Sequence, residues 1–212
     1  MRTRFLALVF SLTATLGGCS LMQDPPPERD FDEAEAYPLM EQIVADTIAD
    51  LPDFPGFHQR SYARPEDCGE ALGGGYDGWV ALEIRYGFTG EDSATELVKI
   101  EYTNLLRERW AAAGYDIHRD DIDPGTGRGS LEAERPDGVN LWWWVADGVS
   151  LTVQTGCVPA TSGFDKPDYI PPAGGGLDTD HAVAGDLMSP PEDSAAAAVD
   201  PFASGSTGPS GS

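Results

Sequence analysis

Lysine is almost absent from this chain of 212 residues, which contains only Lys99 and Lys166. Lys and Arg together number 13 against 36 Asp and Glu residues, so the formal net charge at pH 7 is −23. A surface with this excess of negative charge repels nucleic acid and anionic lipid head groups alike. We therefore predict no nucleic-acid partner. The acid excess permits a cationic partner without indicating one, because exported proteins are commonly acidic.

Residues that often carry catalysis are also scarce and scattered. The three His residues, His58, His118 and His181, lie far apart in the sequence, and no Ser occupies a G-x-S-x-G motif. The Cys residues form no C-x-x-C pair, and the glycine runs lack the strand-to-helix setting of a phosphate loop. The sequence therefore predicts no enzyme, no metal site and no cofactor. The alternative is a cell-envelope enzyme whose site is assembled only by the fold.

A long apolar run is missing as well. The uncharged, largely apolar stretch from residue 5 to residue 16 holds 12 residues, whereas a membrane-spanning helix needs about 20. This stretch follows the basic residues Arg2 and Arg4 and leads into Leu16-Gly17-Gly18-Cys19. A basic start, a short apolar run and small residues at the end are the three parts of a secretory signal.

Leu16-Gly17-Gly18-Cys19 resembles the lipobox of bacterial lipoproteins. In that family the Cys thiol receives a diacylglycerol and the signal peptide is cut just before it. The resemblance implies that Cys19 is the lipid-attachment site and the first residue of the mature chain. The alternative is an ordinary secretory signal, whose small-residue cleavage site is matched only loosely by residues 15–18.

Residue usage supports the same class. Arg far outnumbers Lys, and Ala, Gly, Asp and Pro are abundant, which is typical of a GC-rich genome. Together with the lipobox, this usage resembles the lipoproteins of high-GC Gram-positive bacteria. The resemblance implies a protein held at the cell membrane by its N-terminal lipid and facing the extracytoplasmic side. Removal of residues 1–18 with their two Arg residues would change the formal charge from −23 to −25.

If Cys19 carries the lipid, Cys68 and Cys157 remain as a lone pair. Disulfides persist outside the cytoplasm, so we predict a bridge between these two residues. Closing about 90 residues would stabilise the fold by about 4–5 kcal/mol in the chain-entropy model. The alternative is two unpaired buried thiols.

Composition divides the chain into four parts: a signal peptide over residues 1–18, a lipidated N-terminus and tether over 19–33, a folded domain over 34–160, and a tail over 161–212. The tether contains three consecutive Pro residues, which favour a short, stiff spacer. The folded part holds all five Trp residues. The tail is rich in Gly, Pro, Ala, Ser and Asp, and we predict that it is disordered because it has little apolar surface to bury.

The apolar periodicity of the domain predicts an α+β fold, with two helices packed on an antiparallel sheet of about five to six strands that ends in a meander. The first helix is expected over 35–50. The second is expected to follow a capping box formed by Ser93 and Glu96, and to end at Gly114. The expected strands are residues 57–62, 79–89, 115–119, 129–135, 139–145 and 149–155.

The three consecutive residues Trp142, Trp143 and Trp144 lie on the strand between two predicted hairpins, 136–138 and 146–148. Both turns end in Gly, as a three-residue hairpin with a G1 bulge requires. In that register Trp143 shares the core face with the apolar residues of the neighbouring strands. Trp142 and Trp144 then point to the opposite face.

Two indoles on a polar sheet face form a possible binding surface, because Trp stacks well on sugars, aromatic ligands and proline-rich chains. Alternatively, another part of the chain covers Trp142 and Trp144, such as residues 57–62 or those after Cys157. The sequence as a whole predicts a lipid-anchored extracytoplasmic binding or accessory protein. The expected partners are the membrane, through the lipid, and an envelope protein or glycan.

Overall fold

The computed structural model describes residues 28–63, 68, 78–164 and 168–178. The predicted signal peptide, Cys19 and the last 34 residues lie outside these ranges. The helices are α1 (Glu33–Ile48), α2 (Gly90–Ser93), the π-helix η2 (Leu97–Glu101) and α3 (Tyr102–Ala112). The strands are β1 (Gln59–Ala63), β2 (Trp79–Gly87), β3 (Asp116–Asp120), β4 (Gly129–Glu134), β5 (Asn140–Val145), β6 (Val149–Pro159) and β7 (Leu177–Asp178). None of the described helices combines the length and the apolar character needed to cross a membrane.

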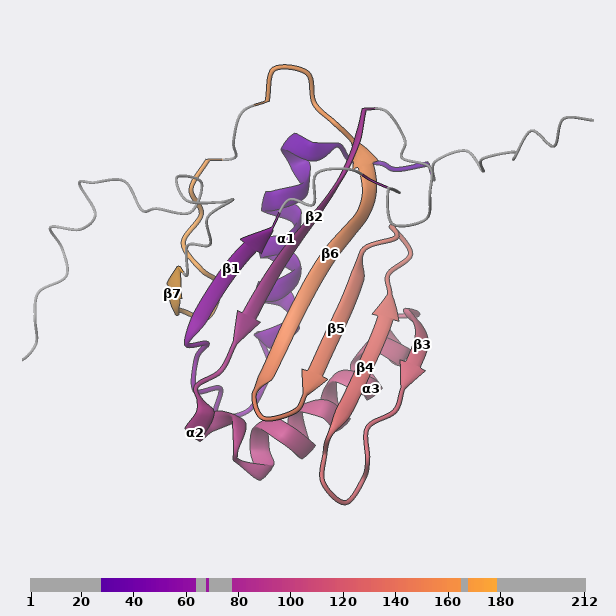
Figure 1. Ribbon diagram of the computed structural model, residues 1–212. Coiled ribbons are helices and arrows are strands. Elements are labelled where there is room, and N and C mark those ends of the chain that lie inside the picture. The colour runs from indigo at the N-terminus through magenta and orange to yellow at the C-terminus, as the bar shows by residue number, and fades with distance from the viewer. Residues whose placement is uncertain (1–27, 64–67, 69–77, 165–167, 179–212) are drawn as a thin grey trace, which may run out of the picture.

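The strands form one sheet in the order β3-β4-β5-β6-β2-β1-β7. Neighbouring strands from β3 to β1 are antiparallel, and only the two-residue β7 runs parallel to its neighbour β1. Helices α1 and α3 both lie behind the same face of the sheet, α1 behind β1 and β2 and α3 behind β5 and β4 (Figure 1). The predicted α+β class is therefore confirmed. No described helix crosses the other face, which is turned toward the viewer in Figure 1.

Helix α1 begins two residues earlier than predicted because Asp32 caps it. The Asp32 carboxylate accepts hydrogen bonds from the backbone N–H groups of Ala34 and Glu35, and the Glu35 carboxylate accepts one from the Asp32 N–H. This reciprocal pair is a capping box. The buried face of the helix includes Met40 and Val44, which recur at helical spacing.

The start of the second helical segment differs from the prediction, because Ser93 and Glu96 do not form a capping box. Thr89 caps α2 by accepting a hydrogen bond from the Asp92 N–H. The Ser93 hydroxyl is buried and instead accepts a hydrogen bond from the Val149 N–H, which joins α2 to the first residue of β6. The predicted end is confirmed: Gly114 has a φ of +76°, the left-handed conformation that closes a helix.

The predicted hairpin register around the Trp residues is confirmed. Trp143 lies opposite Leu131 on β4 and Leu151 on β6, and it is 0% exposed in the core. The indole N–H of Trp143 donates to the Thr103 hydroxyl at 2.9 Å, so its polar atom is satisfied inside the core. Gly148 does not adopt the left-handed conformation expected of a G1 bulge, yet the second turn keeps the register that the prediction requires.

The folded unit begins before residue 34, so the predicted tether is too long at its C-terminal end. Arg29 donates hydrogen bonds to the backbone carbonyls of Asp137 and Cys157, at 2.8 and 3.1 Å. Gly138 and Gly156 make room for this guanidinium, since a Cβ on either residue would overlap Arg29. The N-terminal segment is therefore attached to one end of β6 and to the β4–β5 turn.

The predicted boundary at residue 160 is also too early. Residues 168–178, here called the strap, pack beside α1 and end in β7 at the sheet edge (Figure 1). The backbone carbonyl of Ile170 accepts a hydrogen bond from the buried Arg60 guanidinium at 2.7 Å, and the Ala173 N–H donates to the Tyr86 hydroxyl at 3.0 Å. Composition missed this segment because only a few of its side chains, such as Ile170 and Ala173, pack against the core, and several of its contacts come from the backbone, so it shows no apolar periodicity.

The predicted disulfide between Cys68 and Cys157 is confirmed, with a Cα–Cα distance of 5.6 Å. Cys157 lies near the end of β6, where Arg29 also binds its carbonyl group. Cys68 is 3% exposed, and it precedes β2 in the sequence. The bridge therefore fastens a segment 89 residues away in sequence to the same end of the sheet that holds the N-terminal residues.

Candidate functional site

The outer face of the sheet carries its side chains in rows that cross the strands. Because side chains alternate along a strand, residues paired across neighbouring strands share a face. Arg85 pairs with Thr152, Thr152 with Trp142, Trp142 with Glu132, and Glu132 with Arg119. The pairing thus brings residues of five strands into one row with Trp142 at its centre.

The next row contains Trp144 and much smaller residues. Trp144 lies between Ser130 on β4 and Ser150 on β6, and Gly87 on β2 pairs with Ser150. Ser150 occupies little space beside the large indole, so the sheet face is hollowed there, whereas the Gln59 side chain lies over Gly87. The hollow has a volume of about 400 Å³ and is lined by Arg85, Glu132, Trp142, Trp144, Ser150 and Thr152. We call it the tryptophan hollow.

The two Trp residues contribute differently to the tryptophan hollow. Trp144 is 50% exposed and is one of only two large apolar side chains that are exposed within the described residues. Trp142 is only partly exposed, and its indole Nε1 is buried without a hydrogen-bond partner in the described part of the chain. The prediction that both side chains lie opposite the core is confirmed. The alternative that another described segment covers Trp144 is wrong.

Charged groups at the two ends of the tryptophan hollow are compensated by neighbours. Arg85 lies 3.5 Å from the Glu83 carboxylate and donates a hydrogen bond to the Thr152 hydroxyl at 3.2 Å. At the other end, the Glu132 carboxylate lies 3.4 Å from Arg119 and 3.6 Å from His118. It also accepts a hydrogen bond from the Ser130 hydroxyl. The hollow is therefore bounded by locally balanced charges within a strongly acidic protein.

Glu83 and Glu132 are carboxylates of the outer face, and their spacing bears on hydrolysis. Burial raises the pKa of Glu83, and the nearby Arg85 opposes this shift. A raised pKa is a property of catalytic acids. However, β2 and β4 are separated by three inter-strand intervals, so the two carboxylates lie about 14 Å or more apart. Glycoside hydrolysis needs its two carboxyl groups within about 10 Å of each other. The pair is therefore too widely spaced for that reaction.

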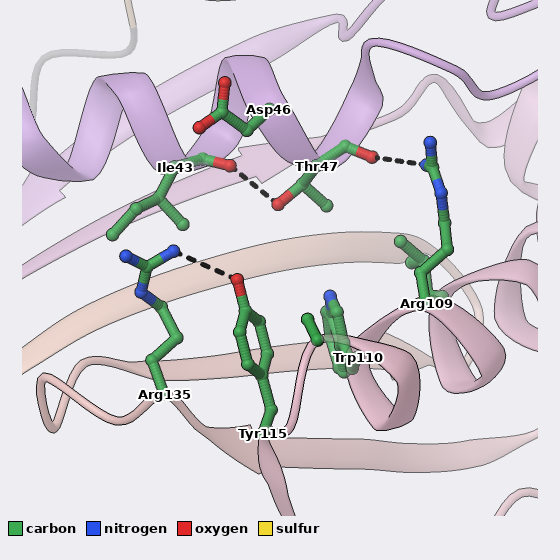
Figure 2. Close-up of a pocket in the computed structure, with 9 residues that line it drawn as sticks. Ile43, Asp46, Thr47, Arg109, Trp110, Tyr115 and Arg135 are labelled. Carbon is green, nitrogen blue, oxygen red and sulfur yellow. Dashed lines mark hydrogen bonds between the residues drawn. The ribbon is translucent and has the colours of Figure 1, made fainter.

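A second hollow, of about 140 Å³, lies between α1 and α3 on the helical side (Figure 2). Figure 2 shows Arg109 and Arg135 reaching toward it from different elements. Arg109 donates to the Thr47 carbonyl near the end of α1 and pairs with Asp50. Arg135 donates to the Tyr115 hydroxyl and pairs with Asp137. Both guanidinium groups thus connect elements of the fold, so the residues around this hollow have a structural role.

A third hollow, of about 340 Å³, lies where η2 and α3 meet the segment after β3. Its main charges, Arg107 and Asp120, form a two-bond ion pair that lowers the pKa of Asp120. The Asp123 carboxylate accepts hydrogen bonds from the backbone N–H groups of Gly125 and Thr126, which shape its own loop. These groups hold the loop against the helix and do not converge on the hollow.

The described His, Cys, Asp and Glu residues do not gather into a metal site. Within the described ranges, no group of three or more His, Cys, Asp or Glu residues could hold a metal ion. Sequence reasoning placed Trp142 and Trp144 on the outer face, but it did not place Arg85 beside them. The reason is that β2 joins β6 through non-local pairing, which local spacing does not reveal.

Comparison with known proteins finds no matching family model, no matching curated protein and no matching solved structure. The functional assignment therefore depends on the sequence motifs and on the geometry of the tryptophan hollow.

Proposed function

We propose that the protein is a lipid-anchored, extracytoplasmic binding or accessory protein, and that the tryptophan hollow is its binding surface. The observation that carries the proposal is the half-exposed Trp144 at the edge of a concave region with hydroxyl groups, on the sheet face that no described helix crosses. Exposing a large aromatic side chain to water is unfavourable unless a partner buries it, and Trp is enriched where partners bind.

The N-terminal end of the described chain and the hollow lie at different ends of the sheet. Arg29 is fastened beside Asp137 and Cys157, whereas Trp144 lies next to the turn between β5 and β6. Asn140 and Trp144 are four residues apart along β5, which corresponds to about 14 Å. A lipid on Cys19 would thus hold the end of the domain away from the hollow and leave the binding surface accessible.

The same geometry limits where the partner can be. Arg29 lies ten positions after Cys19 in the sequence, and an extended chain spans at most about 3.5 Å per residue. The domain would therefore stay within about 35 Å of the membrane surface. An envelope protein or glycan near the membrane fits this reach, and the charge of −23 disfavours nucleic acid.

The lipid anchor is tested by the Cys19→Ala variant. We expect the wild-type chain to partition into the membrane fraction with a diacylglycerol on Cys19, as seen by mass spectrometry, and the variant to accumulate as an uncleaved precursor. A free Cys19 thiol in the wild-type protein, or cleavage at another position, would contradict the anchor.

The binding surface is tested by cosedimentation with isolated envelope fragments. We expect the purified full chain, held in detergent so that its lipid does not insert into membrane, to sediment with them and the Trp142→Ala/Trp144→Ala variant, in the same detergent, to remain in the supernatant. Leu177→Ala is the matched control, because Leu177 is the other exposed large apolar side chain and lies on β7. Equal sedimentation of all three proteins would contradict a role for the tryptophan hollow.

A further inference from the structure

We propose that the ligand of the tryptophan hollow is an uncharged saccharide chain that stacks on the indoles and hydrogen-bonds to the polar groups around them. This inference rests on the proposed function and narrows it to one chemical class. Three features of the hollow support it: the balance of its charges, the kind of polar group on its floor, and its dimensions.

The charge balance indicates a neutral ligand. Arg85 is engaged by Glu83 and Thr152, while Glu132 is engaged by Arg119, His118 and Ser130. An anionic ligand would have to replace Glu83 as the partner of Arg85, and it would approach a protein of net charge −23. A cationic ligand would have to displace Arg119 from Glu132. A neutral ligand disturbs neither ion pair and can still accept hydrogen bonds from Arg85 or donate them to Glu132.

The floor chemistry favours hydroxyl groups over a purely apolar ligand. Ser150 and Thr152 present hydroxyl side chains between the two indoles and Arg85. The Ser150 hydroxyl makes no hydrogen bond within the described residues, so a partner could supply one. A hydrocarbon chain would cover the partly exposed Ser150 hydroxyl without replacing its hydrogen bond to water, which is costly. A sugar ring has apolar C–H faces for the indoles and hydroxyl groups for the floor.

The state of Trp142 argues against a proline-rich peptide. Proline-rich segments dock in aromatic-lined grooves, where a hydrogen-bond donor such as the Trp N–H can bond to a peptide carbonyl. The Nε1 atom of Trp142 is enclosed, so its exposed part is ring carbon alone. A ring without an accessible donor suits stacking by a sugar better than anchoring of a peptide backbone.

The dimensions fit a short oligosaccharide. Arg85 and Glu132 lie on β2 and β4, three strand intervals apart, so the polar ends of the hollow are about 14 Å apart. This is roughly the length of two or three linked pyranose rings. The small side chain of Ser150 leaves space beside Trp144 for a sugar ring. By contrast, the hollow between α1 and α3 has a volume of only about 140 Å³, and the two arginines that line it are already ion-paired.

The test titrates the purified full chain with soluble probes while Trp fluorescence and the heat of binding are recorded. The neutral probes are tetrasaccharides of β-linked glucose and of β-linked N-acetylglucosamine. The comparison probes are a tetrasaccharide of galacturonic acid, which is anionic, and a decaproline peptide. The proteins are the wild type, Trp144→Ala, Ser150→Ala and the control Leu177→Ala.

We expect a neutral tetrasaccharide to bind the wild type and Leu177→Ala equally. Trp144→Ala should raise the Kd by about tenfold, and Ser150→Ala by about threefold. Raising the salt concentration from about 0.05 to 0.5 M should change the Kd by less than about twofold, because no net charge is paired on binding.

Two kinds of result would overturn the inference. If neither neutral tetrasaccharide binds, or if the galacturonate probe binds more tightly and loses affinity with salt, the ligand is not an uncharged saccharide. If decaproline alone binds and Trp144→Ala abolishes that binding, the saccharide inference fails but the tryptophan hollow remains the binding surface. If the Trp variants lose cosedimentation with the envelope fragments but no saccharide binds, the tryptophan hollow is still the binding surface and only the saccharide inference fails.

Discussion

Trp143 and Trp144 are neighbours in sequence, but they have opposite environments. Trp143 is fully enclosed and donates a hydrogen bond to Thr103, whereas Trp144 is 50% exposed. We predict that Trp143→Ala lowers the free energy of unfolding by about 3–5 kcal/mol, because it empties a large core volume. Trp144→Ala should lower it by about 0.5 kcal/mol or less. Urea unfolding of both variants measures the difference, and equal losses would mean that the outer face is covered.

At the residue scale, the free energy of unfolding depends on pH through the Glu83 carboxyl group. Burial raises the pKa of its carboxyl above the usual value, so the folded protein binds a proton more readily than the unfolded chain does. Stability contributed by this group is therefore full below a pH of about 4 and decreases as the pH rises through the folded-state pKa.

The Glu83→Gln variant tests this sign. We predict that it increases the free energy of unfolding at pH 7 relative to the wild type, and that the two proteins have equal stability below a pH of about 4. Denaturant unfolding at the two pH values provides the comparison. A variant that is less stable than the wild type at pH 7 would show instead that the ion pair with Arg85 outweighs the cost of burial.

At the scale of elements, the strap covers a buried ion pair between α1 and β1. Arg60 is 0% exposed and lies 2.7 Å from the Glu41 carboxylate, which also accepts a hydrogen bond from the Tyr86 hydroxyl. The Ile170 carbonyl provides a further acceptor for Arg60. Burial and the adjacent Glu41 carboxylate raise the pKa of Tyr86, which keeps its hydroxyl a donor. The strap is thus part of the polar network that closes this side of the core.

Truncation distinguishes the strap from the residues that follow it. We predict that a chain ending at residue 164 loses about 2–3 kcal/mol of stability, because it removes the hydrogen bonds to Arg60 and Tyr86. A chain ending at Asp178 keeps every described contact and should have an unchanged thermal midpoint. Identical midpoints for the two truncations would show that the strap does not stabilise the domain.

The disulfide acts on a longer element of the chain. Cys68 and Cys157 close a segment of 89 residues that contains most of the sheet. In the chain-entropy model, replacing both residues by Ala should lower the free energy of unfolding by about 4–5 kcal/mol. The matched comparison is the wild type unfolded with and without a reductant. A double variant as stable as the oxidised wild type would contradict this contribution.

At the scale of the whole molecule, local sequence patterns predicted the helices and strands. The order of the strands in the sheet depends on pairing between segments far apart in the chain. Alternation and turn residues were enough to place Trp143 in the core and Trp144 outside it, since register follows from the pleat and the hairpins. Helical spacing predicted both long helices, although the buried Ser93 showed that a cap motif can serve a tertiary contact instead. The signal peptide and Cys19 stay predictions, because they lie outside the described residues.

The parts that sequence reasoning missed share a physical cause. The pairing of β2 with β6, which brings Arg85 beside Trp142, joins segments far apart in the chain. The strap binds partly through backbone groups of Ile170 and Ala173, which every residue type possesses, and the few side chains that it packs against the core form no periodic pattern. Arg29 likewise binds two carbonyl groups. Hydrogen bonds to backbone groups leave no pattern in the residue types, whereas the burial of apolar side chains produces a periodic pattern.

The most direct measurement of the central claim is a ¹H–¹⁵N spectrum of the five indole N–H groups, assigned by single substitutions and recorded during titration with the neutral tetrasaccharide. If the tryptophan hollow binds the ligand, the resonances of Trp142 and Trp144 shift while those of Trp143 and Trp110 stay in place. Trp110 lines the hollow between α1 and α3 and so reports on that site. Shifts at Trp110 with unchanged signals from Trp142 and Trp144 would contradict the account.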